Sequence, residues 1–327
     1  MIRIGLQIPN FTYPGVAPVD LFDRIAGIAR TAEESGFDTV MVMDHFYQLP
    51  TLGPPEHEMF EAYTLLGAIA ARTERAQLGT LVTGVTYRNP TLLAKAVTAL
   101  DVISRGRAFL GIGAAWFDFE HNALGFDFPS TGTRMEMLDE AVQICRAMFR
   151  GEHPTFEGKH YRTVNAINSP APIQAGGPPI MIGGQGEKKT LKLVAKHADM
   201  WNCTAAFDEL PHKLDVLAQH CANVGRDIKE INKTPLGSIV VADTHEAAVA
   251  KRTDFLAARG IDWDALPDEI RKGLEARIVL GDPDEVGERV RAILDTGMDG
   301  VVFNMPADGW DLEAVAQLGE VLTKACN

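Results

Sequence analysis

The sequence contains few cysteines, and none stands in a pattern that binds a metal or forms a redox pair. The four are Cys145, Cys203, Cys221 and Cys326, so the chain has neither a CxxC nor a CxxH pair. This spacing argues against a zinc ribbon, a thioredoxin-type motif and the disulfide framework of a small secreted protein. We therefore expect reduced thiols in a cytoplasmic protein.

Positive charge and long apolar runs are also scarce. The 327 residues include 31 Lys and Arg against 44 Asp and Glu, which gives a formal net charge of −13. Nucleic acids and anionic membranes are bound through clustered basic side chains, so we expect neither as a partner. No apolar run approaches the roughly 20 residues that cross a bilayer. The opening residues, MIRIGLQIPNF, read directly as a strand, so we expect no secretory leader.

Several catalytic motifs are missing as well. The sequence has no GxSxG, HExxH or HxH motif, and no Lys stands at the carboxyl end of a predicted strand. These absences argue against a serine hydrolase, a metal-dependent hydrolase and a Schiff-base aldolase, and we expect no metal site. The first predicted strand runs into IPNF, at 8–11, where a dinucleotide-binding sheet would carry glycines. By elimination, the chemistry points to a bound organic cofactor.

What the sequence does contain is an alternation of strand and helix patterns along its whole length. The predicted strands lie at 2–8, 38–43, 76–82, 107–113, 179–183, 199–203, 236–242 and 300–303. Eight strand–helix units favour an α/β fold of the (β/α)8 TIM-barrel type over a doubly wound open sheet. We expect residues 1–327 to form one domain, with irregular insertions at about 151–178, where a short hairpin fits, and at 257–280. The region 244–276 reads as helices broken by a loop around 262–267.

Three predicted helices begin with recognisable caps. Asn89, followed by a proline, predicts a helix that runs to about residue 104. The pattern Thr133-x-x-Glu136 predicts a capping box after a long loop, and Asp282-x-x-Glu285 predicts another near the end of the chain.

The most informative segment is FDTVMVMDHF, at 37–46, in which a continuous apolar strand ends in Asp44 and His45. A strand of this kind is buried on both faces, so polar groups at its end need partners or a ligand. In a parallel barrel the carboxyl ends of the strands carry the active site. An imidazole gives or accepts a proton near neutral pH, so His45 is a candidate acid–base group. The alternative is a structural pair that holds backbone N–H groups and packs at the rim.

Other polar or small residues also follow predicted strands. They are Asn10, Thr83, Ala114, Ala115, Trp116, Gly183, Gly184, Thr204, Asp243 and Asn304. Small residues at 113–115 would let a flat ring lie close to the backbone. Trp116 either lines such a pocket or packs within its loop.

The segment IGGQGE, at 182–187, is the strongest cofactor signal. A predicted strand ends in glycines there, and a helix follows at once. Exposed backbone N–H groups and a helix N-terminus converge on an anion such as a phosphate. The alternative is that these glycines only form a tight turn between strand and helix.

Taken together, these segments resemble the luciferase-like monooxygenase superfamily, and within it the oxidoreductases that use the deazaflavin coenzyme F420. The matching segments are 37–46, 78–90, 100–116, 178–184 and 198–202, in the expected order and spacing. The resemblance implies a bacterial-luciferase-like TIM barrel, a small-molecule substrate and a homodimer. It also implies hydride transfer at the carbon that replaces the flavin N5.

The same resemblance implies specific site residues. Asp44 and His45 would lie near the deazaflavin ring, and one of them would handle the substrate proton. A non-prolyl cis peptide would join Leu81 to Val82 under the ring. The segment 151–178 would wall the substrate cavity. The residues placed around the cofactor, besides Asp44, are Leu81, Val82, Thr83, Gly113, Ala114, Ala115, Trp116, Gly183, Gly184, Gln185 and Gly186.

One position departs from part of this family. Sugar-phosphate dehydrogenases of the F420 branch carry a Glu where this chain has Trp116. We therefore expect no paired acid at that position, and we do not expect a hexose phosphate as the substrate. The neighbouring Phe117 and Phe119 make the loop apolar, which favours a less polar substrate.

Other functions remain open at this point. An FMN-dependent, two-component monooxygenase would use the same fold, with oxygen and a partner reductase. A non-catalytic barrel would bind F420 or flavin only as a carrier. A metal-dependent amidohydrolase is a more distant alternative. The Asp44–His45 pair and the glycine-rich loop favour the F420-dependent enzyme.

Overall fold

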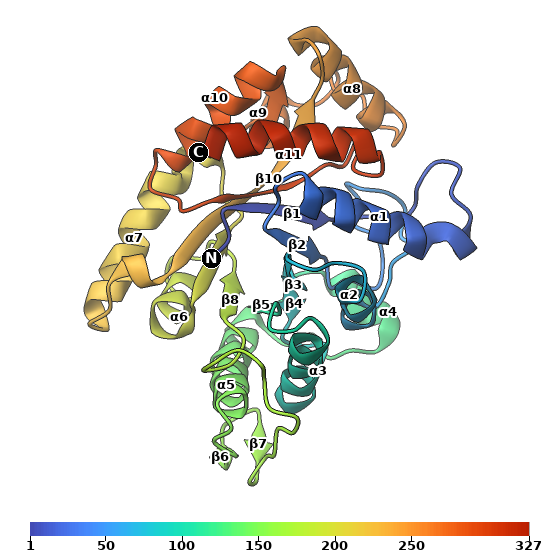
Figure 1. Ribbon diagram of the computed structural model, residues 1–327. Coiled ribbons are helices and arrows are strands. Elements are labelled where there is room, and N and C mark those ends of the chain that lie inside the picture. Colours follow the sequence, from blue (N-terminus) through green and yellow to red (C-terminus); the bar gives the residue numbers. More distant parts are fainter. Residues whose placement is uncertain (327) are drawn as a thin grey trace.

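Parallel strands form a ring at the centre of the structure, a computed structural model that describes residues 1–326 (Figure 1). The strands of the ring are β1 (Ile4–Ile8), β2 (Thr39–Val42), β3 (Gln77–Thr80) with β4 (Thr83–Gly84), β5 (Leu110–Gly113), β8 (Ile180–Gly183), β9 (Met200–Cys203), β10 (Asn232–Val241) and β12 (Val301–Asn304). The last strand pairs with the first, with Ile4 opposite Val301. A bridge between Leu78 and Ala108 joins β3 to the chain just before β5. This arrangement confirms the predicted TIM barrel.

Helices surround the barrel on all sides (Figure 1). They are α1 (Leu21–Glu34), α2 (Ala62–Ala70), α3 (Pro90–Ile103), α5 (Thr131–Phe149), α6 (Thr190–His197), α7 (Leu210–Asn223), α10 (Pro283–Leu294) and α11 (Leu312–Cys326). Short 3₁₀ helices η1 (Pro18–Asp20), η2 (Phe207–Glu209) and η3 (Ile228–Glu230) precede α1, α7 and β10. None of the helices in residues 1–326 combines the length and apolar character needed to cross a bilayer.

The strand sequences explain why both faces of the sheet are buried. In β2 all four residues are buried; Val40 and Val42 pack in the same cluster as the surrounding helices. Met41, between them, belongs to a second cluster inside the barrel. That inner cluster comprises Ile2, Met41, Leu81, Phe109, Met181, Met200 and Val302. The barrel interior is therefore a packed core, and the main cavity lies at the carboxyl ends of its strands.

Two of the three predicted helix caps are confirmed. Asn89 accepts a hydrogen bond from the Thr91 N–H at the start of α3, and Asp282 forms a capping box with Glu285 at the start of α10. The third prediction is wrong, because α5 begins earlier and Ser130 accepts from the Thr133 N–H. The residue predicted as the cap therefore lies inside the first turn.

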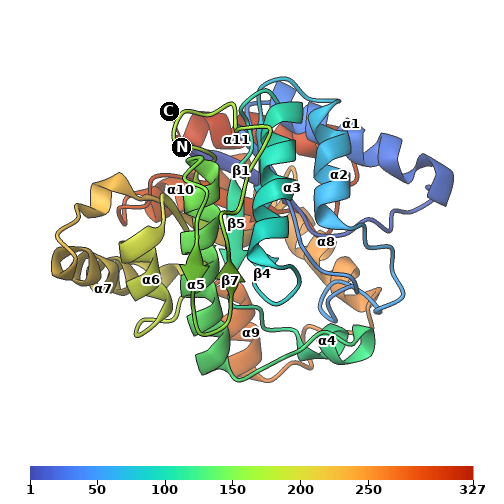
Figure 2. The same ribbon diagram turned by 90° about the horizontal axis from the view of Figure 1, so that it is seen from below.

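Two segments contain regular structure that the sequence did not reveal. The predicted loop before α5 contains α4 (Asp118–Leu124). The helices predicted over 244–276, broken by a loop around 262–267, are confirmed as α8 (His245–Ala257) and α9 (Asp268–Glu275). The segment 257–280 is therefore more regular than predicted, and its strand β11 (Ile278–Gly281) was not predicted. β11 pairs with the second half of β10, alongside residues 238–241. In Figure 2, α4 and α9 lie at the end of the molecule away from the two termini.

β10 begins four residues before the predicted start at Leu236. Its first residues, NKTP, are polar or proline and so read as a loop. They are buried because each finds a partner: the Asn232 side chain exchanges hydrogen bonds with the backbone N–H and C=O of Ile2. The Lys233 ammonium lies 2.5 Å from a carboxylate oxygen of Asp299. Tertiary hydrogen bonds therefore override the apolar pattern here.

The segment 151–178 packs on the outside of the barrel. It contains a short antiparallel hairpin of β6 (Phe156–Glu157) and β7 (Arg162–Thr163). Two carboxylates anchor it through backbone N–H groups: Glu140 of α5 accepts from Tyr161, and Asp101 of α3 accepts from Ile173. The irregular character predicted for this segment, with a short hairpin, agrees with the structure.

Candidate active site

A cavity of about 610 Å³ opens at the carboxyl ends of the barrel strands. This volume is typical of a small-molecule site. The predicted residues that line it are Asp44, His45, Leu81, Val82, Thr83, Gly113, Ala114, Ala115, Trp116, Gly183, Gly184, Gln185, Thr204 and Asn304. Gly186, Asn10 and Asp243 do not line it. Asn10 instead borders a small separate cavity near Tyr13.

The segment 151–178 contributes no lining residue to this cavity. The expectation that it walls the substrate space is therefore wrong. Its anchors explain the difference, because Asp101 and Glu140 hold it against the outer faces of α3 and α5. The cavity instead takes Leu49, Thr51 and Leu52 from the loop that follows β2.

One side of the cavity is formed by the bulge between β3 and β4. The Leu81–Val82 peptide bond is cis, as the resemblance implied. The Val82 side chain packs against the backbones of Gly113 and Gly183. A Cβ atom at either glycine would lie 2.9 Å from a Val82 methyl carbon. Glycine is therefore required at both positions, and Val82 presents an apolar surface between β5 and β8.

A chain of hydrogen bonds holds this bulge from the opposite strands. The Ser238 hydroxyl donates to the Asn304 side-chain oxygen at 2.8 Å, and the Asn304 amide donates to Gln7 Oε1 at 3.1 Å. Gln7 Nε2 then donates to the Leu81 carbonyl at 3.1 Å. Gln7 is buried within the first strand, where its polar character was the only signal that it borders the site.

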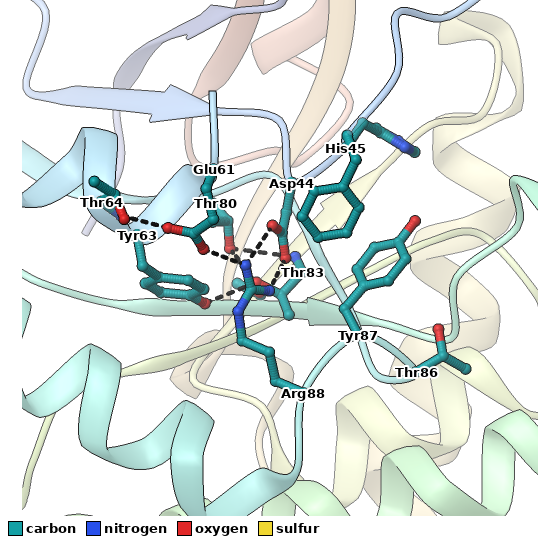
Figure 3. A network of polar contacts seen from close by, with 12 residues as sticks. Asp44, His45, Glu61, Tyr63, Thr64, Thr80, Thr83, Thr86, Tyr87 and Arg88 are labelled. Atoms are coloured by element: carbon teal, nitrogen blue, oxygen red, sulfur yellow. Dashed lines mark hydrogen bonds and ion pairs between the residues drawn. The ribbon is translucent and has the colours of Figure 1, made fainter. Parts of the chain in front are cut away.

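Asp44 is a fully buried carboxylate held by Arg88. The guanidinium donates to its two oxygens at 2.6 and 3.0 Å, and it also pairs with Glu61. Figure 3 shows Arg88 between these two carboxylates, and its guanidinium carbon lies 4.8 Å from the Tyr63 ring centroid. Burial raises the pKa of Asp44, and the Arg88 hydrogen bonds oppose this effect. Because both oxygens bind the guanidinium, Asp44 is better placed to position the rim than to transfer a proton.

His45 is held by a buried acid that the sequence did not reveal. Its Nδ1–H donates to Glu120 at 2.6 Å, and Glu120, in α4, is fully buried. This bond places the ring proton on Nδ1 and leaves Nε2 available to a molecule in the cavity. No acid stands at position 116, as expected from the sequence, but Glu120 supplies a paired acid four residues later. A short helical run closed by Gly125, at φ +75, was the signal that could have revealed it.

Glu120 accepts hydrogen bonds from two segments of the chain. Besides His45, it accepts from the backbone N–H groups of Phe46 at 2.8 Å and Tyr47 at 3.3 Å, and from the Tyr87 hydroxyl. Burial raises the pKa of Glu120, but the bonds from His45, Tyr87 and the Phe46 N–H outweigh it, so the pKa is lowered overall. The carboxylate is therefore ionised near neutral pH and orients the imidazole.

Aromatic side chains surround His45 at the cavity mouth. The rings of Trp116 and Phe117 each lie edge-on to it, with centroids 5.8 Å away. Trp116 is 62% exposed and Phe119 is 50% exposed, although both are large and apolar. Exposed aromatic groups beside a cavity indicate a surface that a ligand covers.

The glycine-rich loop follows β8 and leads towards α6. Gly184 has a φ of +125, and a Cβ atom there would lie 3.3 Å from the Thr190 methyl group at the start of α6. Its carbonyl accepts from the Trp201 indole N–H, and its N–H donates to the Asn202 carbonyl. Gly186 lies outside the cavity lining, and a Cβ atom there would lie 2.9 Å from the Thr190 hydroxyl oxygen. The loop thus brings bare backbone to the cavity wall beside a helix start.

Asn202, at the end of β9, is a second residue that sequence reasoning missed. Its Nδ2 donates to the Thr234 hydroxyl at 3.0 Å, whereas its Oδ1 is buried and has no partner in residues 1–326. It lines the cavity beside the glycine loop, so a bound molecule would satisfy this amide. No group of three or more His, Cys, Asp or Glu side chains within the described residues is arranged to hold a metal ion.

Comparisons with known proteins identify the family. The family model for luciferase-like monooxygenases matches residues 3–300. The chain is 31% identical over 309 residues to a protein from Nocardia farcinica (strain IFM 10152) named F420-dependent glucose-6-phosphate dehydrogenase, covering 86% of this chain and 88% of that protein.

Solved structures share the fold. One is an F420-dependent secondary alcohol dehydrogenase in complex with an F420-acetone adduct, with a TM-score of 0.81, 20% identity and coverage of 100% of this chain and 99% of that one. Another is EDTA monooxygenase from Chelativorans sp. BNC1, with a TM-score of 0.83, 14% identity and coverage of 99% and 93%. At these identities the likeness shows the barrel and does not distinguish one cofactor from another.

Replacing Glu120 with Gln should destabilise the protein by about 2–4 kcal/mol at pH 7, because four donors lose a buried anionic acceptor. The folded-state pKa of Glu120 is lowered, so its contribution is complete above the ordinary value of 4.5, and it is lost as the pH falls from that value through the folded-state pKa. Chemical denaturation measures the free energies of unfolding of wild type and Glu120→Gln. The difference between the two proteins should therefore be smaller at pH 4 than at pH 7. Glu288→Gln, at an exposed site, is the control. Equal stabilities of Glu120→Gln and wild type at pH 7 would contradict the assignment.

Proposed function

The chain belongs to the luciferase-like monooxygenase family, and from this premise we propose that it is an oxidoreductase that uses coenzyme F420. The observation that carries the proposal is His45, which faces the cavity with one ring nitrogen held by Glu120 and the other available. The relative from Nocardia farcinica, named as F420-dependent, supports the choice of cofactor.

The residues at the cavity fit a deazaflavin. Val82 offers an apolar surface for a flat ring, and it is wedged between Gly113 and Gly183. The Gly184 N–H donates to the Asn202 carbonyl, so the backbone N–H groups of the following residues, Gln185 and Gly186, would receive the phosphate. The unpartnered amide oxygen of Asn202 offers a further hydrogen bond. When bound, F420 supplies a ring carbon that exchanges hydride with an organic substrate.

The chain's own residues would bind, orient and handle a proton. His45 Nε2 would exchange a proton with the substrate oxygen, and Glu120 would hold the imidazole in the tautomer that this role needs. Asp44 would act through position and charge, since Arg88 occupies both of its oxygens.

The substrate is proposed to be less polar than a sugar phosphate. Trp116 lines the cavity, and its ring contacts continue through Phe117 to Phe119. The resemblance implies a Glu at the position of Trp116 in the sugar-phosphate dehydrogenases. The relatives named as glucose-6-phosphate dehydrogenases argue for a polar substrate, so glucose 6-phosphate is the comparison compound in any screen. Turnover of alcohols or ketones with apolar groups, and none of glucose 6-phosphate, is the expected pattern.

We also propose a homodimer. Large apolar side chains are exposed on α3 and on the neighbouring segment 151–178: Leu92 is 60% exposed, Ile103 52%, Val164 69% and Ile167 60%. Leu92 borders two shallow grooves, one with Ile103 and one with Val164 and Ile167. Covering this face with a second copy would remove apolar surface from water.

Light scattering after size exclusion should show a dimer for the wild type and a monomer for Leu92→Lys, because a charge would be buried in the interface. Val19→Lys, at a side chain 87% exposed elsewhere on the surface, is the matched control and should stay dimeric. A monomeric wild type at micromolar concentration would refute the homodimer.

Gly184→Val should weaken F420 binding by about tenfold or more. The new side chain would contact Thr190 and fill the space beside the loop backbone, where the phosphate is proposed to bind. Gly176→Val is the matched control: Gly176 also has a positive φ, of +80, but nothing lies within 4 Å of a Cβ atom there. Quenching of tryptophan fluorescence measures both affinities. Wild-type affinity in Gly184→Val would mean that the loop is only a turn.

His45→Ala should reduce turnover by about 10²–10⁴, the range for a lost acid–base group. F420 affinity should stay within about tenfold of the wild type, because the imidazole faces the substrate proton and not the phosphate. Stopped-flow spectroscopy of the deazaflavin, with a substrate found by screening, measures the rate. His160→Ala, at a histidine that binds Glu136 away from the cavity, is the control. Unchanged turnover would exclude His45 from the mechanism.

A further inference from the structure

A second cavity of about 300 Å³ adjoins the first, between β10, β11 and the α8–α9 segment. We refer to it as the side chamber. Its lining shares six residues with the main cavity: Thr51, Leu52, Thr204, Leu236, Ser238 and Asn304. The two spaces therefore adjoin along these six residues.

The rest of the side-chamber wall is mostly apolar. Its large side chains are Phe255 and Leu256 from α8, Ile261 and Trp263 from the following loop, Leu274 from α9 and Ile278 from β11. Trp263 is only 6% exposed. A small aromatic or aliphatic group that binds here would be transferred from water to an apolar environment, which favours binding.

One cation stands in this apolar wall without a partner. The Arg252 guanidinium, from α8, has its central carbon 3.7 Å from the Trp263 ring centroid. Its Nε is buried and has no hydrogen-bond partner in residues 1–326. Burial lowers the pKa of Arg252, and the charges of Glu275 and Asp264 oppose this only in part.

Other buried or half-buried cations of the chain are satisfied. Arg88 binds Asp44 in two places, and Lys233 pairs with Asp299. Arg277, which also lines the side chamber, donates to the carbonyls of Thr204 at 3.2 Å and Gly273 at 2.7 Å. A guanidinium left with a buried, unpaired N–H in an apolar wall is costly unless a ligand supplies the acceptor.

We propose that the side chamber is a substrate subsite that holds an apolar group, and that Arg252 pairs with a carboxylate carried by the same substrate. The inference rests on the proposed function, because it concerns the part of the substrate remote from the reacting carbon. The forked guanidinium matches the two oxygens of a carboxylate, and stacking on Trp263 fixes its orientation. Binding energy from this remote group would align the reacting end beside His45.

The test is calorimetric titration of the purified protein with 4-phenylbutyrate and with its amide, 4-phenylbutyramide, which has the same apolar body and no charge. Wild type should bind the acid at least about tenfold more tightly than the amide, equivalent to about 1.4 kcal/mol. Arg252→Leu should bind the acid and the amide with affinities within about twofold of each other. Arg252→Lys should keep part of the preference for the acid. Trp263→Ala should weaken both ligands.

Arg289→Leu, at an exposed arginine of α10, is the matched control and should behave as wild type. Equal affinities of wild type for acid and amide, no binding of either, or a full preference for the acid in Arg252→Leu would each overturn the proposal. F420 affinity is measured on the same preparations. Normal F420 binding without the acid preference would refute the subsite alone, whereas failure to bind F420 would refute the proposed function.

Discussion

The arrangement of the cavity mouth depends on one buried carboxylate, that of Glu120. It binds His45, the next two backbone N–H groups and the Tyr87 hydroxyl, so it joins the loop after β2 to the segment before α3. A second link, between Asp44 and Arg88, joins the residues immediately beside these. The two links fix the same pair of segments, and together they hold the imidazole at the rim. Each anion here is fully buried, so each depends on its donors for its ionised state.

The cavity combines two different surfaces. On one side, Val82 packs against the backbones of Gly113 and Gly183, and the glycine-rich loop at Gly184 lines the wall, which suits a flat ring that carries a phosphate. On the other side, the wall is aromatic or aliphatic and continues into the side chamber, where Arg252 is the isolated cation. In the proposed function, this division would separate a cofactor region from a substrate region, with His45 between them.

Much of the fold could be predicted from the sequence, because buried parallel strands give continuous apolar runs and helix caps have local patterns. The position of Asp44 and His45 followed from the same reasoning, since strand ends meet at one edge of a barrel. Glu120 could not be found in this way: α4 is short, and its N-terminal residue makes no side-chain cap. The sequence also could not predict that Arg252 Nε has no hydrogen-bond partner or that β11 pairs with β10, because contacts between distant segments decide both. The segment 151–178 was assigned to the cavity wall by resemblance, but Asp101 and Glu140 hold it outside.

The most direct test of the central claim is a titration of the purified protein with F420 and with FMN, followed by tryptophan fluorescence. Trp116 lines the cavity, so a bound ring should quench its emission. The account predicts that F420 binds at about micromolar concentration and FMN at least tenfold more weakly. Tighter binding of FMN would make the protein a flavin-dependent enzyme of the same fold, and binding of neither would contradict the cofactor assignment itself.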